Sequence, residues 1–456
     1  MPSEQLTAEE RRAGISLAVI FFLRMFGLFM VTPVFALYAQ HLEGATPKLI
    51  GVAIGIYGLT QAIFQVPFGL MSDRIGRKPV ISAGLLIFMA GSVMAALSRN
   101  IYMLGVGRAL QGVGAVGSAT LALAADLTRE EQRSKVMAMI GITIGLAFPA
   151  AFVAGPSISA HYGTDKVFLL AALLGLLAIG ALLFWVPNPV ATRFHRDCEV
   201  DPGDVRGVLL NGDLLRLDFG VLALHLIMTA MFVVLPLTLR DAAGLEVKQH
   251  WKVYLPVLFV SVFALGQMLR WSGKGGRMWE VFNGSVLAVA MAEFGLHFLH
   301  ASLWGVMLCL LLFFTAFNFL EASLPSLISQ MAPAQRRGTA MGVYSTCQFL
   351  GIFLGGLCGG WIHGSFGTDA VFLLAGGVAV LWIFVSTRMR FSRLVSRMFK
   401  VAVDSEDQAR EMGSRLTALA GVSEAVVVAG DGVAYLKVDP KIFDPNSVRA
   451  IVPATG

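Results

Sequence analysis

Charged side chains are scarce in this sequence. Of its 456 residues only 14% are Asp, Glu, Lys or Arg, whereas 56% are hydrophobic. A water-soluble globule cannot bury so large an apolar fraction, because its surface needs polar and charged side chains. The composition therefore excludes an ordinary soluble protein and indicates that a bilayer is the solvent for most of the chain.

Cysteines are scarce too, and motifs for catalysis are missing. The four cysteines lie far apart, at Cys198, Cys309, Cys347 and Cys358, and form no C-x-x-C pair. This spacing supports neither a disulfide framework nor a thiolate metal site. No Walker-type phosphate loop and no nucleophile–base constellation stand out. We therefore expect no enzyme activity, no cofactor and no metal, and an ion gradient as the energy source.

Long apolar runs lie between the few charges. A membrane span needs roughly 20 mostly apolar residues, and twelve such segments follow one another. They cover residues 15–39, 48–71, 80–98, 101–126, 135–160, 166–186, 216–239, 251–271, 279–299, 302–329, 339–362 and 368–387. The first run contains Arg24 and shows no small-residue cleavage site, so we expect a span and not a removed signal peptide.

Basic residues are distributed unevenly between the two sides of this predicted bundle. Twenty-two Lys and Arg residues flank the spans on the side of the N-terminus, and six lie on the other side. The positive-inside rule then predicts that both termini are cytoplasmic. The net charge of +6 reflects this topology and contact with anionic membrane lipids, and it indicates no nucleic-acid partner.

The chain contains an internal repeat. The decamer YGTDKVFLLA at 162–171 returns as FGTDAVFLLA at 366–375. At the same offset three further pairs match: Arg133 with Arg337, Met137 with Met341, and Gly155 with Gly359. Six spans in each unit restore the orientation of the chain, so the two halves are parallel repeats. Such halves with a cavity between them suit alternating access.

The repeat divides the chain into four expected parts. These are a six-helix half at 1–186, a cytoplasmic loop at 187–215, a second six-helix half at 216–388, and a basic linker with a small domain at 389–456. Spans five and eleven carry small residues at every fourth position, which let helix backbones approach closely. Span five has Gly141, Gly145 and Pro149, with Ala151 and Gly155 on a neighbouring row, and span eleven has Gly351, Gly355 and Gly359, with Gly356 and Gly360 on a neighbouring row. We expect these spans to meet across the half–half interface, although a static packing seam is the simpler interpretation.

The loop GLMSDRIGRKPV between spans two and three concentrates charge. Its notable residues are Gly69, Asp73, Arg74, Gly76, Arg77 and Lys78. Positive-inside anchoring explains Arg74 and Lys78 but leaves the acid unexplained. The matching loop of the second half, RWSGKGGRMWE, has bases and glycines but no acid at the equivalent place. A feature present in one half is typical of a gate, and we expect this loop to be one.

Several ionisable or amide side chains fall inside the spans. Each charge costs roughly 3 kcal/mol at mid-span on insertion scales, so each is a functional candidate. They are Arg24, Arg108, His225, Asn318 and Glu321. His225 and Glu321 lie at similar depths and could share a proton, because histidine titrates near neutrality. Alternatively, Glu321 pairs with an arginine and locks two helices. For Glu293 and His297 in span nine we expect a structural or outer-mouth role.

The composition becomes that of a soluble domain after the spans. Residues 386–400 form a basic linker, and the following patterns predict a strand at 399–405, a helix at 406–421, strands at 424–430 and 432–439, and a helix at 444–452. The order βαββα indicates a small ferredoxin-like domain, with a Gly-Asp-Gly turn at 430–432. The segment 421–439 resembles heavy-metal-associated domains. Those bind copper through C-x-x-C, and no cysteine follows Cys358, so copper transfer on that pattern is excluded.

These features together resemble the major facilitator superfamily. GLMSDRIGRKP fits that family's first-loop signature, apart from a one-residue displacement of the usual leucine, and GRALQGVGA at 107–115, with Arg108 and Gln111, fits its R-x-x-Q-G motif. The resemblance implies an all-α polytopic membrane protein of twelve transmembrane helices in two six-helix halves, here followed by a small α+β ferredoxin-like domain. It also implies that the spans holding the five intramembrane polar residues line a central cavity.

The resemblance assigns roles to the loop as well. It implies that Asp73 faces the start of span eleven near Gly338, and that Arg77 pairs with Asp126 at the end of span four. These contacts would join the halves only while the carrier faces outward. Proton antiporters of the family often carry G-x-x-x-G-P-x-x-G-G in span five. Here AFVAGPSISA at 151–160 keeps only Gly155-Pro156 of that pattern.

We therefore predict a secondary active transporter, with proton-coupled efflux of small amphipathic compounds by alternating access. The expected partners are a small-molecule substrate, protons and membrane lipids. The alternative is a transporter-like sensor that signals through its C-terminal domain, for which the sequence names no partner or ligand. The gating glycines and intramembrane charges favour transport.

Overall fold

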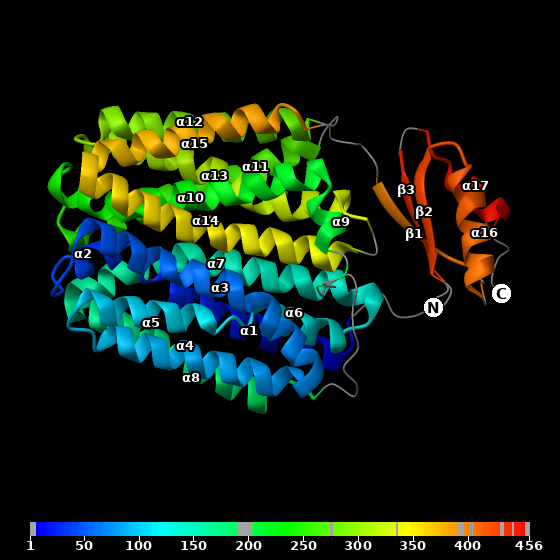
Figure 1. The fold of residues 1–456 in the computed structure, drawn as a ribbon, viewed down its shortest axis with the longest axis horizontal. Coiled ribbons are helices and arrows are strands. Elements are labelled where there is room, and N and C mark those ends of the chain that lie inside the picture. Colours follow the sequence, from blue (N-terminus) through cyan, green and yellow to red (C-terminus); the bar gives the residue numbers. More distant parts are fainter. Residues whose placement is uncertain are drawn as a thin grey trace.

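The structure is a computed structural model, and it describes residues 6–188, 200, 203, 205–273, 277–333, 336–389, 395–401, 403, 405–428, 433–439 and 442–451. A long helix bundle carries a small α+β domain at one end (Figure 1). We call the end of the bundle at which α1 begins the terminal end, and the end at which α2 lies the far end. The Gly-Asp-Gly turn predicted at 430–432 lies outside the described residues.

The first half of the bundle begins with a capped helix. The Thr7 side chain accepts from the Glu10 backbone N–H, and the Glu10 carboxylate accepts from the Thr7 N–H, which satisfies two donors that a helix start leaves free. This capping box extends the first helix seven residues before the predicted apolar span. The helices of this half are α1 (Ala8–Phe29), α2 (Phe35–Ala39), α3 (Pro47–Ile75), α4 (Arg77–Ala96), α5 (Ile101–Val113), α6 (Gly117–Asp126), α7 (Glu130–Tyr162) and α8 (Thr164–Phe184).

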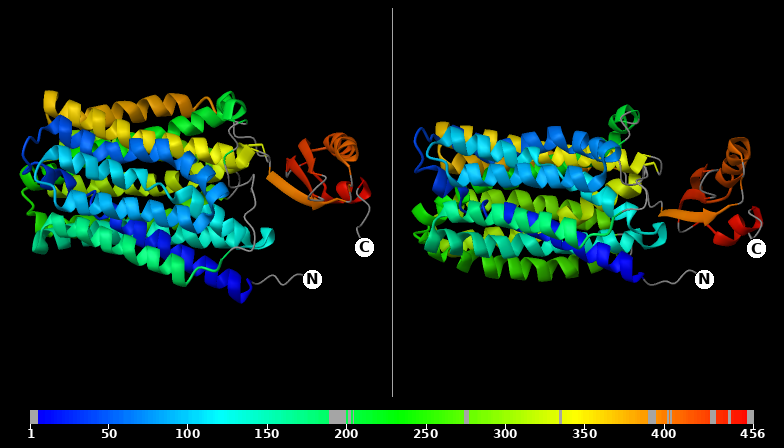
Figure 2. Two further views of the ribbon diagram at one scale, coloured as in Figure 1. Left: turned by 60° about the horizontal axis from the view of Figure 1, so that its bottom comes forward. Right: turned by 90° about the horizontal axis from the view of Figure 1, so that it is seen from below.

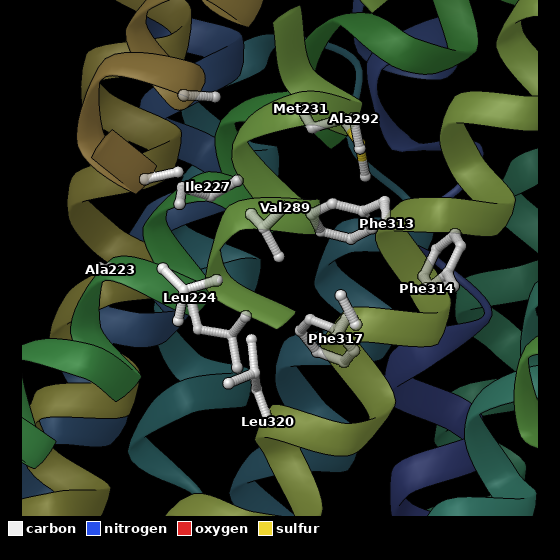
Figure 3. Close-up of a cluster of buried hydrophobic side chains, with 14 of the residues drawn as sticks. Ala223, Leu224, Ile227, Met231, Val289, Ala292, Phe313, Phe314, Phe317 and Leu320 are labelled. Carbon is white, nitrogen blue, oxygen red and sulfur yellow. The ribbon is translucent and has the colours of Figure 1, made fainter. Parts of the chain in front are cut away.

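The second half has an extensive aromatic and aliphatic core. Phe313 and Phe317 lie close to Leu224, Ile227 and Val289 there (Figure 3). The elements of this half are α9 (Val205–Leu209), α10 (Gly212–Asp241), the 3-10 helix η2 (Val247–Gln249), α11 (Trp251–Gly273), α12 (Met278–Leu299), α13 (Leu303–Met331), α14 (Arg337–Phe366) and α15 (Thr368–Ser386).

Eleven helices of the described residues are long and apolar enough to cross a membrane. The predicted fourth span is the exception, because it is broken at 114–116 into α5, of 13 residues, and α6, of 10 residues. Together these two pieces complete the twelfth crossing. The predicted span at 101–126 therefore consists of two helix pieces, which the sequence did not indicate because a hydropathy window cannot detect an interruption made of apolar residues.

The repeat predicted from the decamers extends over both halves. The helices α1 and α10 begin at residues 8 and 212, and the helices α8 and α15 begin at 164 and 368. Both offsets are 204 residues, the offset of the decamers. Gly163 and Gly367, which precede α8 and α15, have the positive φ values of +92° and +88° that favour glycine.

The closest backbone contact between the halves joins α3 and α14. A Cβ atom on Gly356 would lie 2.5 Å from Gly51 O and 2.7 Å from Gly55 N, and one on Gly360 would lie 2.6 Å from Pro47 O. Only glycine permits this approach. The contact occupies the part of α3 nearer the far end (Figure 1).

Spans five and eleven both lie at the contact between the halves, where α7 packs against α11 and α14 against α3, but the matched glycines do not make this contact. Gly351, Gly355 and Gly359 face backbone of α10 at Leu222, Leu226 and Ala230, inside their own half, and Gly155 likewise faces Met30. A second glycine row on α14, Gly356 and Gly360, supplies the interface instead. Its partner is α3, whose glycines the sequence reasoning did not single out.

The small domain has the predicted element order. It consists of β1 (Val395–Lys400), α16 (Glu406–Thr417), β2 (Val422–Val428), β3 (Val433–Val438) and α17 (Pro445–Ile451), with an antiparallel sheet of order β1-β3-β2. The first strand starts four residues before the predicted one, so the end of the predicted basic linker belongs to the sheet. Lys437 Nζ donates to the Met331 carbonyl at 3.2 Å, which links the domain to the end of α13. Both views of Figure 2 show the domain beyond the same end of the bundle.

Candidate functional site

The charged loop between α3 and α4 turns at Gly76, whose φ is +108°. The Arg77 guanidinium is buried behind it. Its Nε donates to Asp126 Oδ2 at 2.8 Å, and its Nη1 donates to Ser72 Oγ at 2.9 Å and pairs with Asp73. The ion pair between Arg77 and Asp126, expected from the family resemblance, is present. It fixes the end of α6 to the loop.

The other loop residues have separate surroundings. Lys78 Nζ donates to the Val186 carbonyl at 2.6 Å, and Arg74 is exposed. Gly69 leaves room for Ser118 of α6. Gly338 is buried at the start of α14. Within the described residues, no hydrogen bond or ion pair joins Asp73 to α14.

A polar cluster in the second half combines three helices. Gln348 Nε2 of α14 donates to His225 Nε2 of α10 at 2.9 Å and to Glu321 Oε1 of α13 at 3.1 Å. His225 Nε2 and Glu321 Oε2 are 3.6 Å apart. His225 Nδ1 faces the Val221 carbonyl at 3.1 Å, so in this arrangement Nδ1 carries the proton and Nε2 accepts.

The two predicted partners thus meet, and a third residue joins them. The Glu321 side chain is 37% exposed, whereas that of His225 is 6% exposed, so Glu321 is the more accessible member, although its Oε2 atom is buried and has no hydrogen-bond partner among the described residues. Sequence reasoning missed Gln348. The signal was an amide inside the otherwise small and apolar α14. Asn318 lies on the same helix as Glu321 and donates to Ser261 Oγ at 3.1 Å.

Asp218 is a further acid that sequence reasoning missed. It is 3% exposed, and neither carboxylate oxygen has a hydrogen-bond partner among the described residues. It precedes His225 by seven residues on α10 and therefore lies on the same helix face. Its position near the start of an apolar span concealed it, because acids there are ordinary flanking residues.

In the first half, the predicted residues inside the spans are two arginines, Arg24 and Arg108. Arg24 Nη2 donates to Gln61 Oε1 at 3.3 Å and to the Gly114 carbonyl at 3.2 Å. Arg108 Nη1 donates to Gln111 Oε1 at 2.6 Å, and Gln111 in turn donates to Ser92 Oγ at 2.8 Å. The two arginines that we expected to line a cavity are therefore buried, and each donates a hydrogen bond to a glutamine side chain. They form no ion pair with Glu321.

Glu293 and His297 do not act together. The Glu293 side chain is fully buried, and both of its oxygens lack a hydrogen-bond partner in the described part of the chain. His297 Nδ1 faces the Asp369 carbonyl at 3.2 Å near the far end. The contact with the Asp369 carbonyl fits the structural or outer-mouth role expected for His297. No contact in the described part of the chain gives Glu293 such a role.

Known proteins are similar to this chain throughout. A sequence profile of the Major Facilitator Superfamily matches residues 17–356 and 217–395. The inner membrane transport protein YajR of Escherichia coli (strain K12) is 42% identical over 453 residues, 99% of each chain. The multidrug resistance protein MdtH of Edwardsiella ictaluri (strain 93-146) is 24% identical over 78% of this chain and 88% of its own.

A solved structure supports the same fold. A bacterial homologue of the human lysosomal transporter Spinster, in an inward-facing and occupied conformation, aligns with a TM-score of 0.70 at 14% identity, over 85% of this chain and 100% of the other. The helix bundle, its repeat and the extent of these matches agree. The chain belongs to the major facilitator superfamily and is a multi-pass membrane transporter, not an enzyme.

Proposed function

We propose that this transporter exports small amphipathic compounds in exchange for protons, by alternating access in an inner membrane with both termini cytoplasmic. The distribution of basic residues supports the orientation. The names of two relatives, an inner membrane transport protein and a multidrug resistance protein, support the location and the substrate class. The terminal end of the bundle is then cytoplasmic, and the ferredoxin-like domain lies there.

The cluster of His225, Gln348 and Glu321 is the observation that carries the proposal. As placed, the Gln348 amide nitrogen donates to an unprotonated imidazole nitrogen and to a carboxylate oxygen. Turned by 180°, the same amide presents its oxygen, which accepts from a protonated imidazole and from a protonated carboxyl. The hydrogen-bonding groups of these three residues can therefore be paired both with and without bound protons. A site with two such arrangements suits a proton that is loaded and released in each cycle.

The accessible carboxylate supplies the contact with water. Because α10, α13 and α14 each contribute one residue, a rearrangement of these helices changes the distances within the cluster. Protonation and helix arrangement are thereby linked, as exchange of a proton for a substrate requires. If proton and substrate compete for the carrier, it can reorient with either of them bound, but not empty.

The gate is the second part of the proposal. We assign Gly69, Asp73, Arg74, Gly76, Arg77, Lys78, Asp126 and Gly338 to a cytoplasmic gate that closes when the carrier faces outward. In the closed gate the Asp73 carboxylate lies at the start of α14, where the helix dipole favours an anion. In the present structure Asp73 pairs with Arg77, and the tight contact between the halves lies toward the far end, which suits an inward-facing carrier.

Replacing Asp73 by asparagine tests this gate. The Asp73→Asn variant loses the charge that the α14 dipole stabilises, so the population shifts toward the inward-facing state. The expected observation is faster modification of cysteine probes at the terminal ends of α3 and α14. An exposed acid at the same end but outside the gate provides the control, because Glu9→Gln should leave that rate unchanged. Equal rates in Asp73→Asn and the unsubstituted protein would refute the gate.

Flux in proteoliposomes tests transport itself. Vesicles with an acidic interior are offered three fluorescent amphipaths: anionic 8-anilinonaphthalene-1-sulfonate, neutral N-phenyl-1-naphthylamine and cationic ethidium. A proton antiporter accumulates at least one of them until the pH gradient is collapsed. The chain truncated after Met389 should transport as well, whereas a sensor transports nothing with or without its small domain. Absence of gradient-dependent accumulation of all three dyes would contradict the proposal.

A further inference from the structure

Two buried arginines of the first half have no opposite charge. Arg24 is 2% exposed and Arg108 is 6% exposed. Across the described residues, neither guanidinium contacts a carboxylate, and the Nε atom of each lacks any hydrogen-bond acceptor. Arginine keeps its charge in proteins. The middle of this half therefore carries two positive charges without a counter-ion.

The surrounding groups supply dipoles only. Arg24 donates to an amide oxygen and to the Gly114 carbonyl, and Arg108 donates to the Gln111 amide. The Arg108 guanidinium lies 5.0 Å from the centroid of the Tyr57 ring and 5.6 Å from that of Phe35. Such partners reduce the cost of burial but leave the charge uncompensated. A ligand with a negative group would complete the pair.

Tyr57 places the two guanidinium groups at one site. Its ring lies beneath the Arg108 guanidinium. Gln61, one helical turn after Tyr57 on α3, accepts from Arg24. An anion beside Tyr57 would thus meet a hydroxyl and two guanidinium groups, of which each retains a free Nε–H donor.

The break between α5 and α6 adds a third positive element. Arg24 binds the carbonyl of Gly114 at the end of α5, and α6 starts three residues later at Gly117. The first N–H groups of α6 have no acceptor within the helix, and the helix dipole is positive there. In transporters, half-helix N-termini of this kind point at anionic substrate groups.

The repeat shows that the fold itself does not require these features. At an offset of 204 residues, Arg24 and Arg108 correspond to Met228 and Leu312, which are apolar. The start of α6 at Gly117 corresponds to Glu321 on the unbroken α13. Only the place of Gly117 thus corresponds to a member of the His225–Gln348–Glu321 cluster, and the two cations have no charged counterpart in the second half. The two halves would then bind different ligands, the anion in the first half and the proton in the second.

We propose that Arg24, Arg108, Tyr57 and the N-terminus of α6 bind the carboxylate, sulfonate or phosphate group of an amphipathic substrate. The inference rests on the proposed transport function and narrows its substrate class to organic anions. Phe349 of α14 lies 6.4 Å from Tyr57, ring centroid to ring centroid, and covers the site from the other half. Ligand binding therefore requires α14 to move relative to α3.

Equilibrium binding with a matched pair of dyes tests the site. Purified protein in phosphatidylcholine nanodiscs is titrated with 8-anilinonaphthalene-1-sulfonate and with N-phenyl-1-naphthylamine, which share the aromatic body and differ in the sulfonate. Fluorescence of empty nanodiscs is subtracted. The protein should bind the sulfonate at least roughly tenfold more tightly than the neutral dye. Arg24→Gln and Arg108→Gln should each raise the Kd of the sulfonate roughly 30-fold or more and leave that of the neutral dye unchanged.

Three controls show whether a change in Kd comes from Arg24 and Arg108 themselves. Arg99→Gln removes an exposed arginine of the far-end loop and should change neither Kd. Arg24→Lys and Arg108→Lys keep the charge and should keep most of the preference, even where a glutamine variant does not fold. Nanodiscs with phosphatidylglycerol distinguish a soluble anion from a lipid headgroup, because a site that takes lipid would lose sulfonate binding there. Equal affinity for both dyes, or equal losses for both in the glutamine variants, would overturn the proposal.

The binding measurement does not depend on whether transport is coupled to protons. Binding at equilibrium needs no gradient, so a sulfonate preference without proton-driven flux contradicts the proposed antiport but keeps the anion site. Proton-driven transport of a dye without any preference for the sulfonate keeps the antiport and refutes the anion site.

Discussion

Glu321→Gln is expected to abolish proton-driven accumulation while leaving the protein folded. The substitution keeps the size and the hydrogen-bonding oxygen of the side chain but removes its ability to bind and release a proton. Glu321 is the accessible acid of the cluster and contacts both His225 and Gln348. Without its proton, downhill exchange of substrate for substrate should continue, because that exchange does not require the carrier to load or release protons.

The measurement compares two kinds of flux in the same proteoliposomes. Accumulation driven by an acidic interior should fall to the level of empty vesicles, whereas exchange of labelled for unlabelled dye should stay within about twofold of the unsubstituted protein. Glu280→Gln makes the same chemical change at an exposed position of α12 and should affect neither flux. Full proton-driven accumulation by Glu321→Gln would exclude this residue as the coupling acid.

Gly356→Val is expected to prevent the tight contact between the two halves. A Cβ atom at this position would lie 2.5 Å from Gly51 O and 2.8 Å from the Gly55 Cα, so backbone of α3 would have to move. Overpacking at such a contact costs about 1–3 kcal/mol or more. The cost applies only to the conformation in which the far end is closed. The carrier should therefore shift to a state that is open at the far end, and transport should fall more than about tenfold, since 1.4 kcal/mol already changes an equilibrium tenfold.

Distances between spin labels at the far end report this shift. Lys48 and Ser365 are exposed near the ends of α3 and α14, and labels there in a cysteine-free background should move apart in Gly356→Val. Gly377→Val is the matched control on α15, where an added Cβ would have no atom within 4 Å. It should leave both the distance and the flux unchanged. An unaltered distance in Gly356→Val would show that the α3–α14 contact does not hold this end closed.

The architecture could be predicted from the sequence because it depends on the lengths of the apolar runs and on the internal repeat. Apolar runs of span length and the repeated decamer define the crossings and the two halves, and the first-loop motif identifies the family. Helix ends were harder to predict. A capping box at Thr7 makes α1 begin before its apolar run, and the positive-φ turn at Gly76 makes α3 end after its run. Hydropathy does not register either feature.

The site could be predicted only in part. His225 and Glu321 are ionisable groups in apolar spans, which a single sequence reveals. Gln348 joins them only because α10, α13 and α14 converge, and convergence of helices is a tertiary property. The same limit applied to the α3–α14 contact: the glycines of α14 were visible, but which of its two glycine rows faces the other half depends on how the helix is rotated.

The most direct test of proton coupling is the release of protons when substrate binds. If substrate and protons compete for one carrier, binding of either must lower the affinity for the other. Purified protein in weakly buffered solution, mixed with a dye that it transports, should therefore acidify the solution, and Glu321→Gln should not. Dye binding without any proton release by the unsubstituted protein, or equal release by Glu321→Gln, would contradict the account.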